Sequence, residues 1–311
     1  MTRPIKEAYD LSDAEKRDRI ALIQQGKALP EKYRFVLFED KHEADPMWNG
    51  KMRDVCTTML PFQTLEHIDE PRTETHAVEV QPGLFVRGFT PPLRLRDFKL
   101  VAFDMDSTLI NIECVDEIAA AGGRKAEVAA ITEAAMRGEI SDYQSSLRQR
   151  LALLRGVPVS ALEAVYSQHL QLNPGVETFV QACQAAGLKT LLVSGGFTFF
   201  SERIRARLKL DFARANMLEI VDDRLTGQLV PRPWGEIVDG AEKRRVLLEV
   251  AELMGIVPEQ AIAVGDGAND LPMMGAAGLS LAYHPKPAVL EQAMLSITQG
   301  GMDRALSLLQ A

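Results

Sequence analysis

Three short apolar runs constrain the fold of this 311-residue chain more than any other feature. The runs are "LVAFD" at residues 100–104, "TLLVS" at 190–194 and "AIAVGD" at 261–266. Each run is continuous rather than alternating, which is typical of parallel strands that are buried on both faces. Helical patterns lie on either side of the second and third runs, at about 174–186, 197–209, 241–254 and 270–277. This alternation predicts an α/β fold with a doubly wound parallel sheet.

Each of these runs ends in polar residues. The residues in question are Asp104 and Asp106 after the first run, Ser194 and Gly195 at the second, and Asp266 at the third. Ligands of open α/β folds bind at the carboxyl ends of the strands, so we expect these residues to meet at one edge of the sheet. Clustered carboxylates suit a hard divalent cation such as Mg²⁺. A carboxylate that faces a metal-bound phosphoryl group can act as a nucleophile, and a neighbouring acid can transfer protons.

The composition excludes several classes of protein. The formal net charge of -8 argues against a general nucleic-acid-binding protein, because such a protein needs a basic face. The three cysteines, Cys56, Cys114 and Cys183, form no C-x-x-C pair, so we expect neither a disulfide framework nor a zinc site. The N-terminus is too charged for a signal peptide, and no apolar run approaches the roughly 20 residues that span a bilayer. We therefore expect a cytoplasmic protein without nucleic-acid or membrane partners.

The chain changes character near residue 90. Residues 1–90 are polar, are interrupted by prolines and contain no chemical motif, so we expect a small N-terminal accessory segment of unknown function. Residues 91–311 are expected to form the catalytic domain. The stretch "TPPLRLRDF", at 90–98, is typical of a linker between the two. Local patterns predict a helix at 14–25 and strands at 34–40 and 83–89.

Two inserts interrupt the alternation of strands and helices. Residues 111–171 are mostly helical and follow the first strand. Helices are expected within this insert near 125–137 and 141–154. Because the insert follows the carboxyl end of a strand, it should overhang the ligand-binding edge as a lid. Residues 217–230 alternate around Asp222 and Asp223, which predicts a β-hairpin with these two residues in its turn.

Four ordered motifs connect this arrangement to a known family. The segments "DMDST", "VSGG", a lysine borne on a helix and "GDGAND" resemble the four motifs of the haloacid dehalogenase superfamily of phosphatases. From about residue 99 to about 290, the longer blocks "DMDSTLINIECVDEIA", "VSGGF" and "VGDGAND" are similar to the phosphoserine phosphatase family. The resemblance implies a Rossmann-like core with a helical cap. It also implies Mg²⁺-dependent hydrolysis of O-phospho-L-serine to L-serine and phosphate, the last step of serine biosynthesis, through an aspartyl-phosphate.

The resemblance assigns the chemistry to the aspartates. Asp104 would attack phosphorus, and Asp106 would act first as the acid and then as the base. The metal would be held by the carboxylates of Asp104 and Asp266 and by the backbone carbonyl of Asp106. Asp270 would support these ligands from behind. Mg²⁺ is the one cofactor that the resemblance implies.

The resemblance also assigns residues to the phosphate. Ser194 and the backbone N–H of Gly195 would bind phosphoryl oxygens at a helix N-terminus. Lys243 would neutralise charge on the transferred group, and Asn269 would support the phosphate side of the pocket. Helical spacing supports Lys243 independently, because it lies on the same face as the apolar stripe that begins at Val246. The alternative is a lysine that extends along this stripe to solvent.

Two residues of the insert are assigned to the serine part of the substrate. Arg150 lies in an apolar stripe with Leu147 and Leu151, where a guanidinium needs an anionic partner. By resemblance this partner is the substrate carboxylate, and the alternative is an ion pair within the lid. Glu113 would bind the substrate amino group, and the alternative is a solvated acid at the start of a helix. The neighbouring Cys114 is expected to be a packing residue rather than a nucleophile.

Other functions stay open at this stage. A phosphotransferase that passes the phosphoryl group to homoserine would share these motifs, as would a phosphatase of another small phosphomonoester. A receiver-like domain is also doubly wound and phosphorylated on aspartate. Receivers lack an acid two residues after the phosphorylated one and have no helical lid, so Asp106 and residues 111–171 argue against this function. Both enzymatic alternatives act on a small molecule, and the sequence indicates no oligomeric state.

Overall fold

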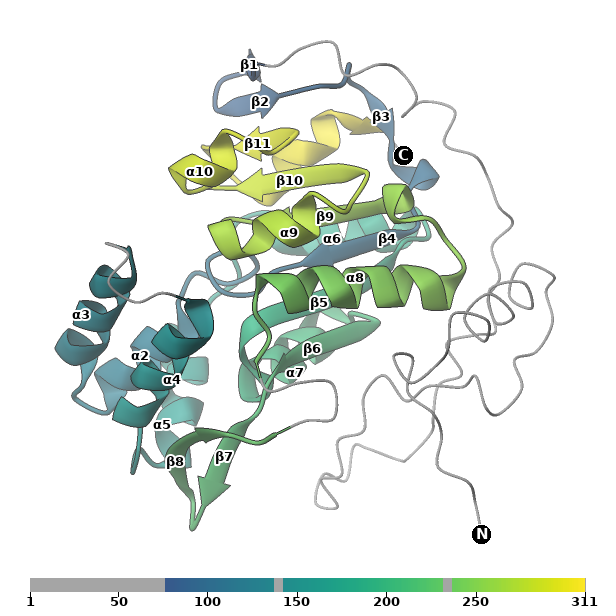
Figure 1. The fold of residues 1–311 in the computed structure, drawn as a ribbon. Coiled ribbons are helices and arrows are strands. Elements are labelled where there is room, and N and C mark those ends of the chain that lie inside the picture. The colour runs from purple at the N-terminus through teal and green to yellow at the C-terminus, as the bar shows by residue number, and fades with distance from the viewer. Residues whose placement is uncertain (1–75, 137–141, 232–236, 311) are drawn as a thin grey trace, which may run out of the picture.

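The structure is a computed structural model that describes residues 76–136, 142–231 and 237–310. Within these ranges, eight strands form one sheet (Figure 1). In sheet order the strands are β1 (Val78–Gln81), β2 (Leu84–Val86), β11 (Leu295–Ile297), β10 (Leu279–Tyr283), β9 (Ala261–Gly265), β4 (Leu100–Phe103), β5 (Lys189–Phe197) and β6 (Phe212–Asn216). The strands from β11 to β6 run parallel, whereas β1 and β2 pair antiparallel.

The three predicted strands lie side by side in the middle of this sheet. They are β9, β4 and β5, and β4 pairs with both of the others. Every residue of β4 and β9 is buried, which is why their apolar runs are continuous rather than alternating. The prediction of parallel strands from these runs is therefore confirmed.

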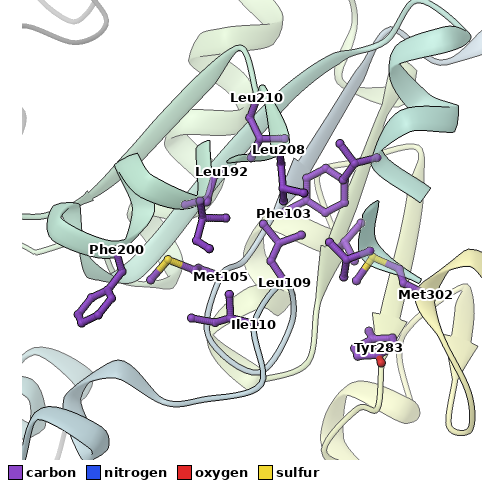
Figure 2. Packing of buried hydrophobic residues seen from close by; sticks show 14 of the residues in the cluster. Phe103, Met105, Leu109, Ile110, Leu192, Phe200, Leu208, Leu210, Tyr283 and Met302 are labelled. Atoms are coloured by element: carbon purple, nitrogen blue, oxygen red, sulfur yellow. The ribbon is translucent and has the colours of Figure 1, made fainter. Parts of the chain in front are cut away.

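Helices cover both faces of the sheet, so the doubly wound fold is also confirmed. They are α6 (Val176–Ala185), α7 (Thr198–Leu208), α8 (Gly240–Met254) and the short α9 (Leu271–Met274), which follows η7 (Ala268–Asp270). Side chains of β4 point alternately to the two sides. Leu100 and Ala102 pack in one cluster with Val246 of α8, and Val101 and Phe103 pack in the cluster that contains residues of α6 and α7. Figure 2 shows Phe103 within this second cluster.

The insert after β4 forms a helical cap, as predicted. Its elements are α2 (Cys114–Ala121), α3 (Lys125–Met136), α4 (Tyr143–Leu153), α5 (Val159–Ala164) and the π-helical turn η5 (Val165–His169). Figure 1 shows these helices grouped together at one end of the sheet. The buried Leu147 and Leu151 belong to the same continuous hydrophobic cluster as Val101 and Phe103 of β4. The cap is thus packed against the core.

The predicted hairpin is present, but it joins the cap rather than the sheet. It consists of β7 (Leu218–Val221) and β8 (Arg224–Leu229), which pair antiparallel. Asp222 and Asp223 have φ values of 50° and 58°, as a tight two-residue hairpin turn requires. The N–H of Gly156, after α4, donates to the carbonyl of Leu225 at 2.8 Å. The local pattern predicted the hairpin, whereas its attachment to the cap depends on contacts distant in sequence.

The structure corrects the boundary expected at residue 90. β2 lies before this boundary, yet it pairs with β11, and its Leu84 and Val86 are buried. The expected linker at 90–98 is wrong for the same reason. It contains β3 (Leu93–Arg94), which pairs with β12 (Leu309–Gln310), and η4 (Leu95–Asp97), and it buries Leu93, Leu95 and Phe98. The strand predicted at 83–89 is found as β2, and the patterns at 14–25 and 34–40 lie outside the described residues.

Three short elements complete the described part of the chain. They are η6 (Pro258–Gln260), α10 (Pro287–Leu290) and η8 (Met302–Ser307). None of the helices in the described ranges combines the length and the apolar character that a bilayer crossing requires.

Candidate active site

Asp104 and Asp106 follow β4 at the edge where β9 and β5 also end. The N–H of Asp104 donates to the carbonyl of Val264 in β9 at 2.9 Å, and the residue is 5% exposed. A β-carbon placed on Gly196, at the end of β5, would lie 3.3 Å from Oδ1 of Asp106. The polar ends of the three central strands therefore meet, as the sequence predicted.

Lys243 enters this edge from α8. Its Nζ lies 2.6 Å from Oδ1 of Asp104 and 2.7 Å from Oδ1 of Asp270, and the side chain is buried. Burial alone would lower the pKa of Lys243, but the two carboxylates more than offset this effect and raise it. Lys243 is therefore a buried ammonium ion held between two aspartates. The alternative of a lysine that extends to solvent is wrong.

Three buried carboxylates form a compact cluster around this ammonium ion. One oxygen from each of Asp104, Asp266 and Asp270 lies within 4.8 Å of the others. Burial and the charge of Asp270 raise the pKa of Asp104, against the lowering effect of Lys243. Burial also raises the pKa of Asp266, opposed by the nearby Lys286. These shifts reflect the cost of placing several negative charges in one buried site.

The loop after β9 fixes Asp270 more tightly than Asp266. Oδ2 of Asp270 accepts the backbone N–H groups of Asp266 and Gly267 at 3.1 and 3.0 Å, while its Oδ1 contacts the lysine ammonium. Within the described residues, the carboxylate of Asp266 instead receives two longer contacts, from Thr108 Oγ1 and from Lys286 Nζ, both at 3.3 Å. Both oxygens of Asp270 are thus used within the protein, which fits a residue that supports the site from behind.

Asp106 is held by two contacts from Cys114, the residue that follows Glu113. The backbone N–H of Cys114 donates to Oδ2 of Asp106 at 3.0 Å, and its thiol lies 3.1 Å from Oδ1. Burial, together with the charge of Glu113, raises the pKa of Asp106 to about 7, although the contacts from Cys114 oppose this shift. Burial also raises the pKa of the Cys114 thiol, so it stays protonated and can donate. Cys114 is buried, as expected, but it also positions Asp106.

Ser194 and Gly195 lie at the end of β5, before α7. Oγ of Ser194 accepts the N–H of Gly196 at 2.9 Å, which leaves the hydroxyl proton available to a ligand. The carbonyl of Gly195 accepts Nδ2 of Asn216 at 2.8 Å, and Oδ1 of Asn216 accepts the N–H of Val238 at 2.8 Å. Asn216 therefore ties the end of β5 at Gly195 to the chain that leads into α8. Sequence reasoning missed Asn216, because its position depends on the pairing of β5 with β6.

Asn269 lies in η7, which packs against the start of α8. It is half-buried, and a β-carbon on Gly240 would lie 2.8 Å from its backbone carbonyl. Gly240 is the first residue of α8, so this close approach brings Asn269 towards the helix that carries Lys243. The structure thus places Asn269 beside the aspartate cluster, at the side of the lysine helix.

The two cap residues assigned to the substrate are half-buried. Glu113 precedes α2, and its Oε1 accepts the hydroxyl of Ser107 at 2.8 Å. Arg150 lies on α4, where its Nε is 3.4 Å from the carbonyl of Ser146. Within the described residues, its guanidinium forms no ion pair with a carboxylate. The alternative of a structural ion pair in the lid therefore finds no partner in this part of the chain.

Two further residues of this region were missed. Nδ2 of Asn173 donates to the carbonyls of Ser107, Thr108 and Ile110, at 3.2, 2.9 and 3.0 Å, and so holds the loop after Asp106. Tyr143, the first residue of α4, reaches Gly195 with its hydroxyl. The sequence signal for Tyr143 was its place after Asp142, which caps α4 by accepting the N–H of Ser145 at 2.7 Å. That signal marks the start of a helix but not the contact.

The motif order and this geometry agree with the comparisons with known proteins. The sequence profile of haloacid dehalogenase-like hydrolases matches residues 101–275, which is more than half of the chain. The chain belongs to this family. Among its relatives is a protein of a Polaromonas species named phosphoserine phosphatase, which is 66% identical over 232 residues and covers 75% of this chain and 98% of the relative. Another relative with this name, from Albidiferax ferrireducens, is 63% identical over 235 residues, or 76% of this chain and 99% of the relative.

Solved structures of this hydrolase family are also similar. A phospho-aspartyl intermediate analogue of phosphoserine phosphatase matches with a TM-score of 0.63 at 36% identity, covering 68% of this chain and 99% of that one. A hydrolase of the family from Salmonella enterica serovar Typhi matches with a TM-score of 0.64 at 39% identity, covering 71% and 72%. Each comparison leaves about a quarter or more of this chain unmatched.

Proposed function

We propose that this haloacid dehalogenase-like hydrolase is a Mg²⁺-dependent phosphoserine phosphatase. It would hydrolyse O-phospho-L-serine to L-serine and phosphate, the last step of serine biosynthesis. One observation carries the proposal: two charged cap residues act on the same site as the buried aspartates and Lys243. Burial and the charge of Glu113 raise the pKa of Asp106, and the charge of Arg150 acts on Tyr143 together with that of Lys243. Within the described residues, the guanidinium of Arg150 has no carboxylate partner. This combination supplies partners for an ammonium, a carboxylate and a phosphate in one substrate. Relatives of 66% and 63% identity with this name support the assignment.

The residues at the edge of the sheet fit a magnesium ion. Their donors are hard oxygen atoms, and three buried carboxylates lie within 4.8 Å of one another. We propose that the carboxylates of Asp104 and Asp266 and the backbone carbonyl of Asp106 hold the ion, with Asp270 behind them. When bound, Mg²⁺ would offset the carboxylate charges and polarise the phosphoryl group.

Asp104 and Asp106 would carry the two chemical steps. In the first, a carboxylate oxygen of Asp104 attacks phosphorus, the bond from phosphorus to the serine oxygen breaks, and Asp106 donates a proton to that oxygen. In the second, Asp106 takes a proton from water, which attacks phosphorus and releases phosphate from Asp104. A residue with a pKa of about 7 can both give and take a proton near neutral pH.

The remaining residues would bind and orient the substrate. The hydroxyl of Ser194 and the N–H of Gly195 would donate to phosphoryl oxygens, and Lys243 would offset their charge. Asn269 would support this side of the pocket. On the cap, Arg150 would hold the carboxylate by two hydrogen bonds and Glu113 would hold the amino group. The core would then hold the phosphate end of the substrate, and the cap would hold its amino-acid end.

The test is phosphate release from a panel of phosphomonoesters with Mg²⁺, with and without homoserine. We expect phosphoserine to have the highest kcat/KM and to yield equal amounts of serine and phosphate. Formation of O-phosphohomoserine in place of phosphate would identify a transferase instead. A higher kcat/KM for another small phosphomonoester would reassign the substrate. Removal of Mg²⁺ with EDTA should abolish turnover, and its return should restore it.

We also propose a cytoplasmic location and an accessory role for the N-terminal segment. The described cysteines, Cys114 and Cys183, are free and buried, which suits a reducing compartment. The two relatives are almost fully covered by about three quarters of this chain. Residues that precede the sheet would therefore add stability, assembly or regulation to a complete catalytic unit.

A further inference from the structure

The start of α4 brings two cap side chains onto the catalytic core. Nε2 of Gln144 donates to Oδ2 of Asp239 at 2.7 Å. Asp239 is the N-cap of α8, where its Oδ1 accepts the N–H of Glu242 at 2.9 Å. The same helix carries Lys243. The cap is thus hydrogen-bonded to the helix that supplies the buried lysine. This contact fixes the position of Tyr143, the residue before Gln144.

The side chain of Tyr143 reaches the end of β5. Its hydroxyl occupies the space that a β-carbon on Gly195 would need, and its Cζ lies 3.2 Å from the same position. The residue at this position must therefore be glycine while the cap lies where it does. The hydroxyl is placed directly against Gly195, whose N–H is assigned to the phosphate.

The charged groups around Tyr143 are those of the active site. Burial raises the pKa of Tyr143 to about 12, against the lowering effects of Lys243 and Arg150 and together with the raising effects of Asp104 and Asp106. The hydroxyl is therefore protonated throughout the physiological range, and it can donate a hydrogen bond without adding a charge. It lies within electrostatic reach of the nucleophile, the proton donor and both substrate-binding cations.

The described residues offer this hydroxyl no acceptor. The carbonyl of Gly195 is already taken by Asn216. The carbonyl of Val238 lies 3.2 Å from the same β-carbon position, but no hydrogen bond joins it to Tyr143. A phenylalanine would pack equally well between cap and core. The hydroxyl group therefore indicates that a polar ligand binds here. The ligand assigned to Ser194 and Gly195, at the end of β5, is the phosphoryl group.

We propose that Tyr143 is a further substrate-binding residue, whose hydroxyl donates a hydrogen bond to the phosphoryl group held at Ser194 and Gly195. Gln144 positions it through the contact with Asp239. The inference rests on the proposed function in one respect, the placement of the phosphoryl group at the end of β5. Because every phosphomonoester presents the same group, Tyr143 would contribute equally to all substrates, unlike Arg150.

The experiment compares Tyr143→Phe with Tyr166→Phe, which loses the same atom from a cap tyrosine beside Arg203. Calorimetry with inorganic phosphate and Mg²⁺ gives Kd, and kinetics give kcat/KM for phosphoserine and phosphoethanolamine. We expect Tyr143→Phe to raise Kd about tenfold, as for loss of one hydrogen bond to a charged acceptor, and to lower kcat/KM by a similar factor for both esters. Tyr166→Phe should leave all three values unchanged. Gln144→Leu should raise Kd and lower both kcat/KM values by a smaller factor. If Tyr143→Phe does not fold, Gln144→Leu tests the role of Tyr143 in its place.

Two results would overturn the inference. Unchanged phosphate affinity in a folded Tyr143→Phe variant, even with a lower Tm, would mean that the hydroxyl serves only the junction of cap and core. A loss confined to phosphoserine would mean that it contacts the serine part of the substrate. Phosphate binding can be measured whichever ester the enzyme prefers. Failure to hydrolyse phosphoserine would therefore defeat the proposed function while leaving this test intact.

Discussion

The core edge and the cap hold their site residues in opposite ways. At the core edge, Lys243 and Asp270 are fully buried, and Asp104 is 5% exposed. Lys243 contacts both carboxylates, at 2.6 and 2.7 Å, and offsets part of their charge. In the cap, Glu113 and Arg150 are half-buried, and the guanidinium has no carboxylate partner among the described residues. The fold thus pairs the charged groups that we propose perform the chemistry, and it leaves the guanidinium that we propose recognises the substrate without a carboxylate partner in the described residues.

This difference has a physical basis. Buried charges are costly unless they are paired, so a reactive carboxylate at the end of a central strand needs a permanent counter-ion. A recognition residue gains specificity when the correct substrate supplies its partner, because a substrate without that group leaves it unpaired. Substitutions in the core should therefore abolish chemistry on all substrates, whereas substitutions in the cap should change the choice among them.

The largest effect is expected for Asp104→Asn. An amide is a poor nucleophile, so turnover and the phosphoenzyme should both be lost. The matched variant is Asp106→Asn, which keeps the nucleophile and should slow turnover by roughly 10²–10⁴-fold while still accepting phosphate. The measurement is acid-quenched labelling of the protein from radiolabelled phosphoserine. Label retained by the Asp104→Asn protein would show that another residue is the nucleophile.

Arg150→Ala should separate recognition from chemistry. It would leave the substrate carboxylate desolvated and unpaired, at a cost on the order of 2–5 kcal/mol. Phosphoethanolamine has no carboxylate, so its kcat/KM should fall much less than that of phosphoserine. Arg148→Ala, on the exposed side of the same helix, is the control and should change neither value. Equal losses for both esters in a folded Arg150→Ala variant would instead assign Arg150 to the shape of the cap.

Two truncations should distinguish the contribution of strands β1 and β2 from that of the residues that precede the sheet. A fragment of residues 76–311 should keep the kcat/KM of the full chain. A fragment of 91–311 removes β1 and β2, and loses the burial of Leu84 and Val86, each worth about 1.5–3 kcal/mol. Its Tm should be lower by about 10 °C. A folded 76–311 fragment without activity would assign a catalytic contribution to the N-terminal segment.

The smallest expected effect is the pH dependence of stability without metal. Because the pKa of Asp106 is raised to about 7 in the fold, the native state binds more protons than the unfolded state between about pH 4 and 7. The free energy of unfolding should therefore fall as pH rises through this window. In EDTA, we expect a Tm about 5 °C lower at pH 7.5 than at pH 5.5.

Asp106→Asn is the control for this measurement, since its side chain does not titrate. It should show a smaller change in Tm over the same interval. Mg²⁺ at pH 7.5 should recover the lost stability, because it binds the native state. If the Tm of the unmodified protein and that of Asp106→Asn changed equally with pH, groups other than Asp106 would be responsible for the change.

Much of the core was predictable because its signals are local. The continuous runs at 100–104 and 261–266 must be buried on both faces, and only a central position in a parallel sheet provides this. Lys243 was predictable from its place on the apolar face of α8. Short strands outside the centre of the sheet carry no such signal. β2 has three residues, and residues 90–98 are rich in proline and arginine, so pairing with β11 and β12 could not be read from either.

By itself, the sequence determined which groups are available and the order in which the chain delivers them. Strand and helix periods, the two acids after β4 and the turn at Asp222 and Asp223 all follow from the preferences of neighbouring residues. The tertiary structure alone decided which distant groups share space. Tyr143 meets Gly195 because the cap is packed against the core, and no pattern near either residue encodes that contact. The proposed recognition of phosphoserine would depend on such contacts, since it requires groups from both regions at once.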